Sequence, residues 1–137
     1  MEGIVSCRKD GEMDILLTPQ EAVDREVGLW PAAEHERLEL IRQVYTEDAI
    51  VYGSKAIFRG WNQIAEWIHG YQESDSPVRV ARISEIEVTS GWARFEWRAW
   101  VDSSGDSFEG AEVVHFAPDG RIDQLVVFYG LRLPPLG

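Results

Sequence analysis

One carboxylic acid stands among apolar residues in the segment Gly110–Gly130, which reads GAEVVHFAPDGRIDQLVVFYG. Alternating residues on both sides of Pro118-Asp119-Gly120 are typical of a β-hairpin. In the first strand of this hairpin, Glu112 shares a face with Val114 and Phe116. An acid on the apolar face of a sheet costs free energy unless a partner or a function compensates for it. Glu112 is therefore a candidate for acid–base chemistry or ligand contact, the alternative being a structural acid paired with a polar neighbour.

Asp123, in the second strand of the hairpin, is another candidate acid. Because it lies close to the turn, a solvated turn residue is the alternative interpretation. If both acids pointed inward, they would form a proton donor and acceptor suited to a dehydratase or an epoxide hydrolase. A register that places Asp123 opposite Val114 would set it one diagonal step from Glu112.

Hydroxyl and imidazole groups add to the possible chemistry. Tyr129, Tyr71 and Tyr52 are candidate hydroxyl donors, although tyrosines in cavity walls commonly serve as core residues. His69 would supply a base near neutral pH if it tilted inward, and otherwise it is a surface residue. The histidines and the single Cys7 show none of the spacings of a metal site, and no nucleotide or phosphate motif occurs. The sequence therefore predicts neither a metal nor a cofactor.

The composition limits the class of protein. The 137 residues, 45% of them hydrophobic, suit one domain with a substantial core, and the six tryptophans suggest a cavity or a subunit contact as well. A net charge of −11 disfavours nucleic acid and anionic membrane surfaces as partners. No apolar run approaches the ~18–20 residues that span a bilayer, and residues 1–17 lack the pattern of a secretory signal. We therefore expect a cytoplasmic location.

The elements that must position these groups follow from periodicity and turn residues. Thr18-Pro19 predicts the start of a helix in which Val23, Val27 and Trp30 share one face. A later helix carries an apolar stripe of Ile64, Trp67, Ile68 and Tyr71. Helices are predicted over 20–30, 33–45 and 60–72, and strands over 49–52, 78–89, 92–102, 107–117 and 121–132.

Helices followed by a long antiparallel meander predict an α+β domain with the helices packed on one face of the sheet. Residues 1–17 would be a loose arm or an extra edge strand. A four-residue turn after the strand over 92–102 would pair Trp97 with Glu112 and Phe95 with Val114. The face toward the helices would carry Phe95, Trp97, Ala99, Glu112, Val114, Phe116, Asp123, Leu125, Val127 and Tyr129, and the other face Arg94, Glu96, Arg98, Trp100, Val113 and His115.

The chain contains three motifs in order: YTEDAIVYG at Tyr45–Gly53, RGWNQIAEWI at Arg59–Ile68 and EGAEVVHFAPDGRIDQLVVFYG at Glu109–Gly130. Together they resemble the nuclear transport factor 2-like superfamily, and within it the SnoaL-like branch. Ketosteroid isomerase, polyketide cyclases, scytalone dehydratase and limonene epoxide hydrolase belong to this superfamily. The resemblance covers residues 18–133 and leaves 134–137 as a tail. It implies a cone-shaped α+β barrel, with three N-terminal helices packed on a strongly bent antiparallel sheet.

The resemblance also implies a deep pocket for a small apolar molecule. It further implies a homodimer built on the outer sheet face, where Trp100 and Val113 would lie. Aligned on the DGRI turn, Glu112 falls where ketosteroid isomerase has a protonated acid that donates a hydrogen bond to the substrate oxyanion. Desolvation by an apolar wall would keep such an acid neutral. From this alignment and from the apolar faces, the predicted ligand-binding residues are Trp30, Ile64, Trp67, Ile68, Tyr71, Phe95, Trp97, Val114, Phe116, Leu125 and Val127.

Two departures from ketosteroid isomerase limit the functional prediction. Gly53 stands where that enzyme has its general base, and the segment Gln20–Trp30 contains no tyrosine to match its oxyanion donor. Steroid isomerisation is therefore not implied. We expect an isomerase, cyclase or dehydratase with Glu112, Asp123 and Tyr129 as candidate catalytic residues. A non-catalytic hydrophobic ligand-binding domain and a dimerisation scaffold whose tryptophans fill the pocket are the alternatives, and the sequence leaves the choice open.

Overall fold

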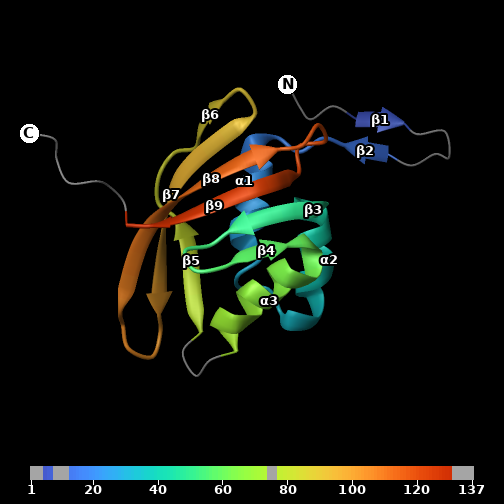
Figure 1. Ribbon diagram of the computed structural model, residues 1–137. Coiled ribbons are helices and arrows are strands. Elements are labelled where there is room, and N and C mark those ends of the chain that lie inside the picture. The colour runs from blue at the N-terminus through green and yellow to red at the C-terminus, as the bar shows by residue number, and fades with distance from the viewer. Residues whose placement is uncertain (1–4, 8–12, 74–76, 131–137) are drawn as a thin grey trace, which may run out of the picture.

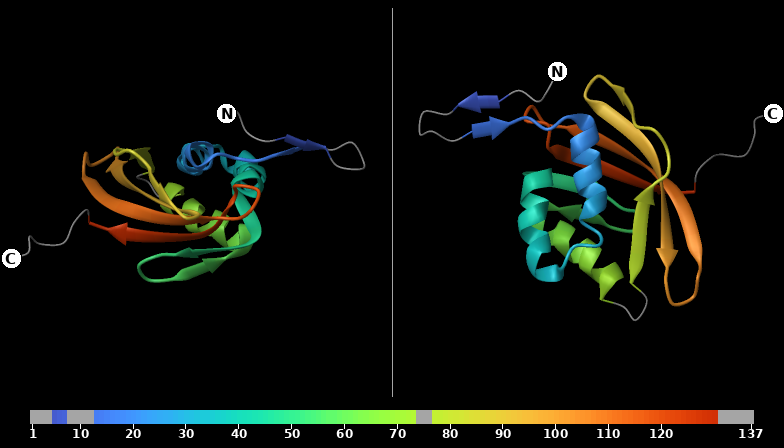
Figure 2. Two further views of the ribbon diagram at one scale, coloured as in Figure 1. Left: turned by 90° about the horizontal axis from the view of Figure 1, so that it is seen from above. Right: turned by 180° about the vertical axis from the view of Figure 1, so that it is seen from behind.

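The computed structural model describes residues 5–7, 13–73 and 77–130 of the chain. Three helices, α1 (Pro19–Gly28), α2 (Glu34–Val44) and α3 (Gly60–Gln72), lie inside the curve of one strongly bent sheet (Figures 1 and 2). The described strands of this sheet are β3 (Tyr45–Tyr52), β4 (Ile57–Arg59), β5 (Val78–Arg82), β6 (Glu87–Thr89), β7 (Trp92–Val101), β8 (Ser107–Phe116) and β9 (Ile122–Tyr129).

The strands follow the order β4-β3-β9-β8-β7-β5, and β6 pairs with β7 beside β5. Neighbouring strands are antiparallel except for β3 and β9, which run parallel. The curved sheet does not close on itself, and α1 crosses its open side (Figure 2). This architecture confirms the predicted α+β cone with helices on one face of a bent, mostly antiparallel sheet.

Helix α1 begins where Thr18-Pro19 predicts. The Thr18 hydroxyl accepts a hydrogen bond from the backbone N–H of Glu21 at 3.1 Å, and the Glu21 carboxylate accepts one from the N–H of Thr18 at 2.9 Å. This reciprocal capping box fixes the first turn of the helix. Further along, α1 buries Val23 and Glu26.

The strand predicted over 49–52 is longer than expected, because β3 begins at Tyr45 directly after α2. The backbone of Tyr45 is already extended, with φ −111° and ψ 146°. Its carbonyl accepts a hydrogen bond from the Trp61 indole N–H at 2.9 Å, which joins the start of β3 to α3. The third predicted helix, over 60–72, is confirmed.

Two strand predictions needed correction. The single strand expected over 78–89 is divided into β5 and β6, because the chain between them bonds to the side of β7. The Ile83 N–H donates to the Glu96 carbonyl at 2.9 Å, and the Glu96 N–H donates to the Ser84 hydroxyl at 2.8 Å. Strand β4 was not predicted. In the N-terminal arm, β1 (Val5–Cys7) and β2 (Met13–Ile15) pair only with each other and lie away from the main sheet (Figure 1).

The predicted register of β7 and β8 is wrong by two residues. Phe95 lies opposite Glu112, and Trp97 lies opposite Gly110. The cause is the position of the turn, which still has four residues: a hydrogen bond from the Val101 N–H to the Asp106 carbonyl at 2.8 Å closes it over residues 102–105, one residue earlier than the predicted 103–106. Because side chains alternate with a period of two, this shift leaves the predicted faces unchanged. Accordingly Phe95, Trp97, Ala99, Glu112, Val114, Leu125 and Val127 are buried.

The predicted position of Asp123 opposite Val114 is also wrong, since Val114 pairs with Leu125. An irregularity beside His115 leaves Asp123 without a strand partner. Its carboxylate instead lies 2.7 Å from Nδ1 of His115.

Candidate functional site

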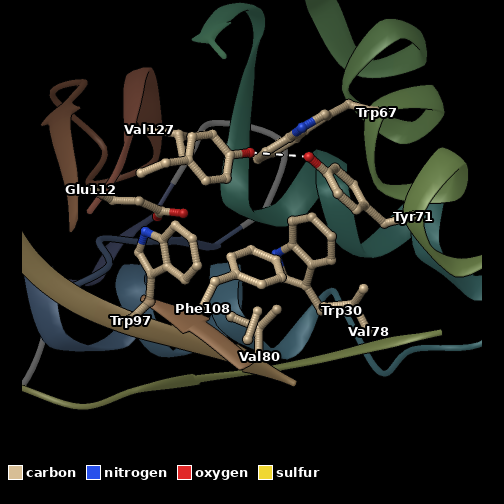
Figure 3. A pocket seen from close by; sticks show the side chains of 11 residues that line it. Trp30, Trp67, Tyr71, Val78, Val80, Trp97, Phe108, Glu112 and Val127 are labelled. Atoms are coloured by element: carbon tan, nitrogen blue, oxygen red, sulfur yellow. Dashed lines mark hydrogen bonds between the residues drawn. The ribbon is translucent and has the colours of Figure 1, made fainter. Parts of the chain in front are cut away.

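A small pocket opens between the helices and the inner face of the sheet (Figure 3). Its free volume of about 30 Å³ is enough for about two water molecules. Most of its wall is aromatic or aliphatic, and Glu112 is the acid among the lining residues. The lining consists of Trp30, Trp67, Tyr71, Val78, Val80, Trp97, Ala99, Phe108, Glu112, Val127 and Tyr129.

The aromatic rings of the wall hold one another in place by edge-to-face contacts. The Trp30 ring lies 5.2 Å from that of Trp67 and 5.6 Å from that of Tyr71. On the opposite side, the Trp97 ring meets those of Tyr129 at 5.6 Å and Phe108 at 5.7 Å. Such pairs add about 0.5–1.5 kcal/mol each to the free energy of apolar burial, so they stabilise the aromatic walls of the pocket.

Two tyrosines join the helical side of the pocket to the sheet. The hydroxyls of Tyr71 on α3 and Tyr129 on β9 lie 3.1 Å apart, as the dashed line in Figure 3 marks. Together with Trp67, they also line a wider groove of about 510 Å³, which includes Gly53 and Lys55. The tyrosine pair therefore separates the inner pocket from this outer groove. Burial, assisted by the contact with Tyr71, raises the pKa of Tyr129.

Glu112 projects from β8 into the pocket and is only 6% exposed. The indole nitrogen of Trp97 points toward its carboxyl group in Figure 3. Behind it lies a second buried acid, Glu26 of α1, which is 1% exposed. In the described part of the chain, both carboxylate oxygens of Glu26 and Oε1 of Glu112 are buried without a hydrogen-bond partner.

Burial is the main influence on the protonation of both acids. It raises the pKa of Glu26 to about 7, although contacts with Glu112 and Trp30 act in the opposite direction. Burial also raises the pKa of Glu112 well above its usual range, and the neighbouring carboxyl of Glu26 raises it further. The buried hydroxyl of Tyr45 has a raised pKa for the same reasons, namely burial and the charges of both acids. Both shifts favour the protonated, uncharged form of each acid.

Sequence reasoning missed Glu26, although the chain carries a signal for it. Glu26 follows Val23 by three residues and precedes Trp30 by four, so it belongs to the apolar stripe of α1. The prediction placed Val27 on that stripe, whereas Val27 is only partly buried. Tyr45 was missed because it was predicted to end the helix over 33–45, whereas it begins β3, where its hydroxyl is buried.

The structure brings only part of the predicted site together. Glu112 and Tyr129 line the pocket, whereas Asp123 is bound to His115 and does not line it. His69 lies between Glu34 of α2 and Glu73, as expected of a surface histidine. Of the predicted ligand-binding residues, Trp30, Trp67, Tyr71, Trp97 and Val127 line the pocket, Ile64, Ile68, Phe95, Val114 and Leu125 are core residues, and Phe116 is partly buried against the core.

The pocket also has wall residues that were not predicted. Phe108 lies near the start of β8, and Val78 and Val80 belong to β5, which was expected to be part of a longer strand. Among the described residues, no group of three or more His, Cys, Asp or Glu side chains is arranged to hold a metal ion. No helix in the described ranges is long and apolar enough to cross a membrane.

Comparison with known proteins gives matches at the level of structure. No protein-family model matches the sequence, and no curated protein matches it either. A proposed isomerase of the SnoaL-like family from Agrobacterium tumefaciens C58 is 22% identical, with a TM-score of 0.72 over 80% of this chain and 94% of its own. A proposed polyketide cyclase from Sinorhizobium meliloti is 14% identical, with a TM-score of 0.65 over 81% of this chain and 99% of its own.

A de novo designed protein with a curved β-sheet is also similar, at 14% identity and a TM-score of 0.63 over 82% of this chain and 84% of its own. At these identities the likenesses show the fold alone. The chain has the nuclear transport factor 2-like fold that its motifs predicted. A fold shared with a designed protein implies no particular activity, so function has to be argued from the site.

Proposed function

We propose that this protein is an acid–base enzyme that isomerises, cyclises or dehydrates a small, largely apolar molecule, with Glu112 as the group that exchanges protons with it. The observation that carries the proposal is a buried acid with an unpartnered oxygen at the wall of an aromatic pocket. Buried polar groups ordinarily have partners, and an exception of this kind calls for a ligand, a water or a catalytic role. An acid held neutral by burial suits proton donation at pH 7.

A single carboxyl group can complete such a reaction without a second base. In a dehydration, Glu112 would donate its proton to the departing hydroxyl, which leaves as water with the electrons of the C–O bond. The resulting carboxylate would remove a proton from the adjacent carbon, whose C–H electrons form the double bond. In the isomerisation of a β,γ-unsaturated ketone, Glu112 would first give its proton to the carbonyl oxygen, and its carboxylate would then remove a proton from the α-carbon to leave a dienol. Glu112 would next give that proton to the γ-carbon and take back the proton on oxygen, which forms the conjugated ketone and restores the acid. The absence of an acid at Gly53 is compatible with either cycle.

The size of the pocket limits the substrate. About 30 Å³ admits a group of only a few atoms unless side chains move. The rings most able to move are Phe108 and Tyr129, which are 36% and 43% exposed. Their displacement would enlarge the pocket on the side of the outer groove. We therefore propose a small cyclic or branched substrate with one oxygen atom directed at Glu112.

The first test uses two simple probes that yield one product. A β,γ-unsaturated cyclohexenone would isomerise to the conjugated enone, and a β-hydroxycyclohexanone would lose water to give the same enone. We expect the protein to accelerate at least one of these conversions, as followed by the ultraviolet absorbance of the product. Glu112→Gln removes the transferable proton and should lower the rate by about 100-fold or more.

Glu36→Gln is the matched control, because Glu36 is exposed on α2 and should leave the rate unchanged. Acceleration by wild type and Glu112→Gln alike would contradict the role of Glu112. The second candidate function is a dimerisation scaffold whose tryptophans fill the pocket, which the small free volume favours. In that case neither probe would be converted or raise the melting temperature of the protein, whereas a probe that raises it and is recovered unchanged would indicate non-catalytic binding.

A further inference from the structure

Behind the pocket wall, four side chains from different elements bring unpartnered polar atoms together. They are Glu26 of α1, Tyr45 at the start of β3, Trp97 of β7 and Glu112 of β8. Within the described residues, five atoms of these side chains are buried without a hydrogen bond: both carboxylate oxygens of Glu26, Oε1 of Glu112, the Tyr45 hydroxyl and the Trp97 indole nitrogen. The side chains of Glu26 and Glu112 contact each other, and the charges of both acids act on the Tyr45 hydroxyl.

Among the residues that the structure describes, no cation balances the two acids. In the described ranges, neither Glu26 nor Glu112 forms an ion pair with Lys, Arg or His. Two carboxylates in a low-dielectric interior cannot both remain ionised, because each also bears the cost of its own desolvation. Written as two carboxylates, the pair contains acceptors only. A proton on one carboxyl group makes that group a hydrogen-bond donor to the other carboxylate. One oxygen of each acid then has a hydrogen-bond partner.

We propose that Glu26 and Glu112 hold a single proton between them at neutral pH, with Glu112 presenting it to the pocket and Glu26 acting as its positioning residue. Glu112 lines the pocket and Glu26 does not, so only Glu112 meets a ligand. The groups facing this pair are the hydroxyls of Tyr45 and Tyr129 and the indole N–H groups of Trp30 and Trp97. None of them is cationic, so the shared proton is what removes one of the two negative charges of the pair.

This inference rests on the proposed function for its use, since it explains how Glu112 keeps a proton to exchange. The carboxylate of Glu26 accepts the hydrogen bond of the Glu112 O–H at rest. When Glu112 gives its proton to a ligand, the pair would hold two charges, so the return of a proton to Glu112 is favoured. Glu26 of α1 thereby helps to return a proton to Glu112, which is part of the acid–base role that an acid at the position of Gly53 would have had.

The test follows the two carboxyl groups directly, without any ligand. In protein labelled with ¹³C at the glutamate carboxyl carbons, the signals of Glu26 and Glu112 are assigned by their absence from Glu26→Gln and Glu112→Gln. At pH 8 in wild type, we expect one of the two signals at the position of a protonated acid and the other at that of a carboxylate. In Glu26→Gln, Glu112 should lose its proton at a pH lower by about one pH unit or more.

Glu36→Gln should leave both titrations in place, because Glu36 is exposed on α2. Two ionised carboxyl groups in wild type at pH 7, or an unchanged Glu112 titration in Glu26→Gln, would overturn the proposal. The wild-type titration suffices if Glu26→Gln does not fold. If the two acids share a proton but the protein converts neither probe, the proposed acid pair stands and the proposed enzymatic function is contradicted. If the protein converts a probe but the two acids titrate independently, the enzymatic function stands and the proposed acid pair is contradicted.

Discussion

At the scale of single residues, a buried acid pair makes the stability of the fold depend on pH. In the unfolded chain Glu26 titrates near 4.5, whereas burial raises its pKa to about 7 in the folded protein. The pKa of Glu112 is raised in the same direction. A group whose pKa is higher in the folded state stabilises the fold at low pH and loses that contribution as pH rises through the folded pKa.

We therefore predict that the free energy of unfolding falls as pH rises from about 4.5 to 7 and above. Each proton that the folded protein binds in excess contributes a slope of about 1.4 kcal/mol per pH unit. Glu26→Gln replaces the titrating acid by a neutral amide, so its stability should decline less steeply over the same range. Urea unfolding at a series of pH values measures both slopes, and equal slopes in wild type and variant would contradict the raised pKa of Glu26.

The sequence could identify one member of this pair and not the other. Glu112 stands out because a strand alternates with a period of two, and Val114 marks its face as apolar. On a helix, an apolar stripe is broader, so Glu26 and Val27 compete for the same face until the packing is known. That the two acids meet depends on how α1 crosses the sheet, which no local pattern of residues encodes.

At the scale of the elements, the junction of β8 with its neighbours depends on a glycine. Gly110 lies opposite Trp97 on β7 and Tyr129 on β9. A Cβ atom there would lie 2.7 Å from Cε2 of Trp97 and would also collide with the backbone carbonyl of Phe128. The missing side chain thus makes room for the indole ring that forms one wall of the pocket.

Gly110→Ala should therefore destabilise the fold by about 1–3 kcal/mol, as expected for overpacking against atoms that cannot all move away. It should also change the fluorescence of Trp97 by displacing its ring. The matched control is Gly28→Ala, because nothing lies within 4 Å of a Cβ atom built at the end of α1. This second variant should be as stable as wild type or gain up to about 1 kcal/mol. Equal melting temperatures for the two variants would contradict this prediction, because they would show that β8 shifts to accommodate the added methyl group without loss of stability.

Element boundaries could be predicted where the chain carries its own signal. Thr18 and Pro19 start α1 as expected, and Gly60 marks the start of α3. The predictions of strand boundaries and register are wrong where contacts between elements determine the structure. Ser84 interrupts the predicted strand by bonding to β7, and the register of β7 with β8 depends on the position of a turn that the Ser103-Ser104-Gly105 signal did not define to the residue.

At the scale of the whole molecule, the outer face of the sheet carries an apolar row that crosses four strands. Val113 of β8 pairs with Val126 of β9, Val126 with Tyr52 of β3, and Tyr52 with Ile57 of β4. On the same side, the next pair of β8 and β9 adds Phe128, which is 53% exposed. Charged residues such as Arg94 and Arg98 flank this row on β7.

We predict that this outer face joins two copies of the chain into a homodimer. Burying Phe128 and the apolar row would recover free energy at about 25 cal/mol per Å² of apolar surface removed from water. Phe128→Asp would place a charge in that interface and should convert the dimer to a monomer, as measured by light scattering after gel filtration. Val88→Asp is the control, because Val88 is equally exposed at 53% but lies on β6, opposite Ala93, whose side chain is buried in the core. A monomeric mass for the wild-type protein at tens of micromolar, or loss of the dimer in both variants, would contradict the assignment of this face.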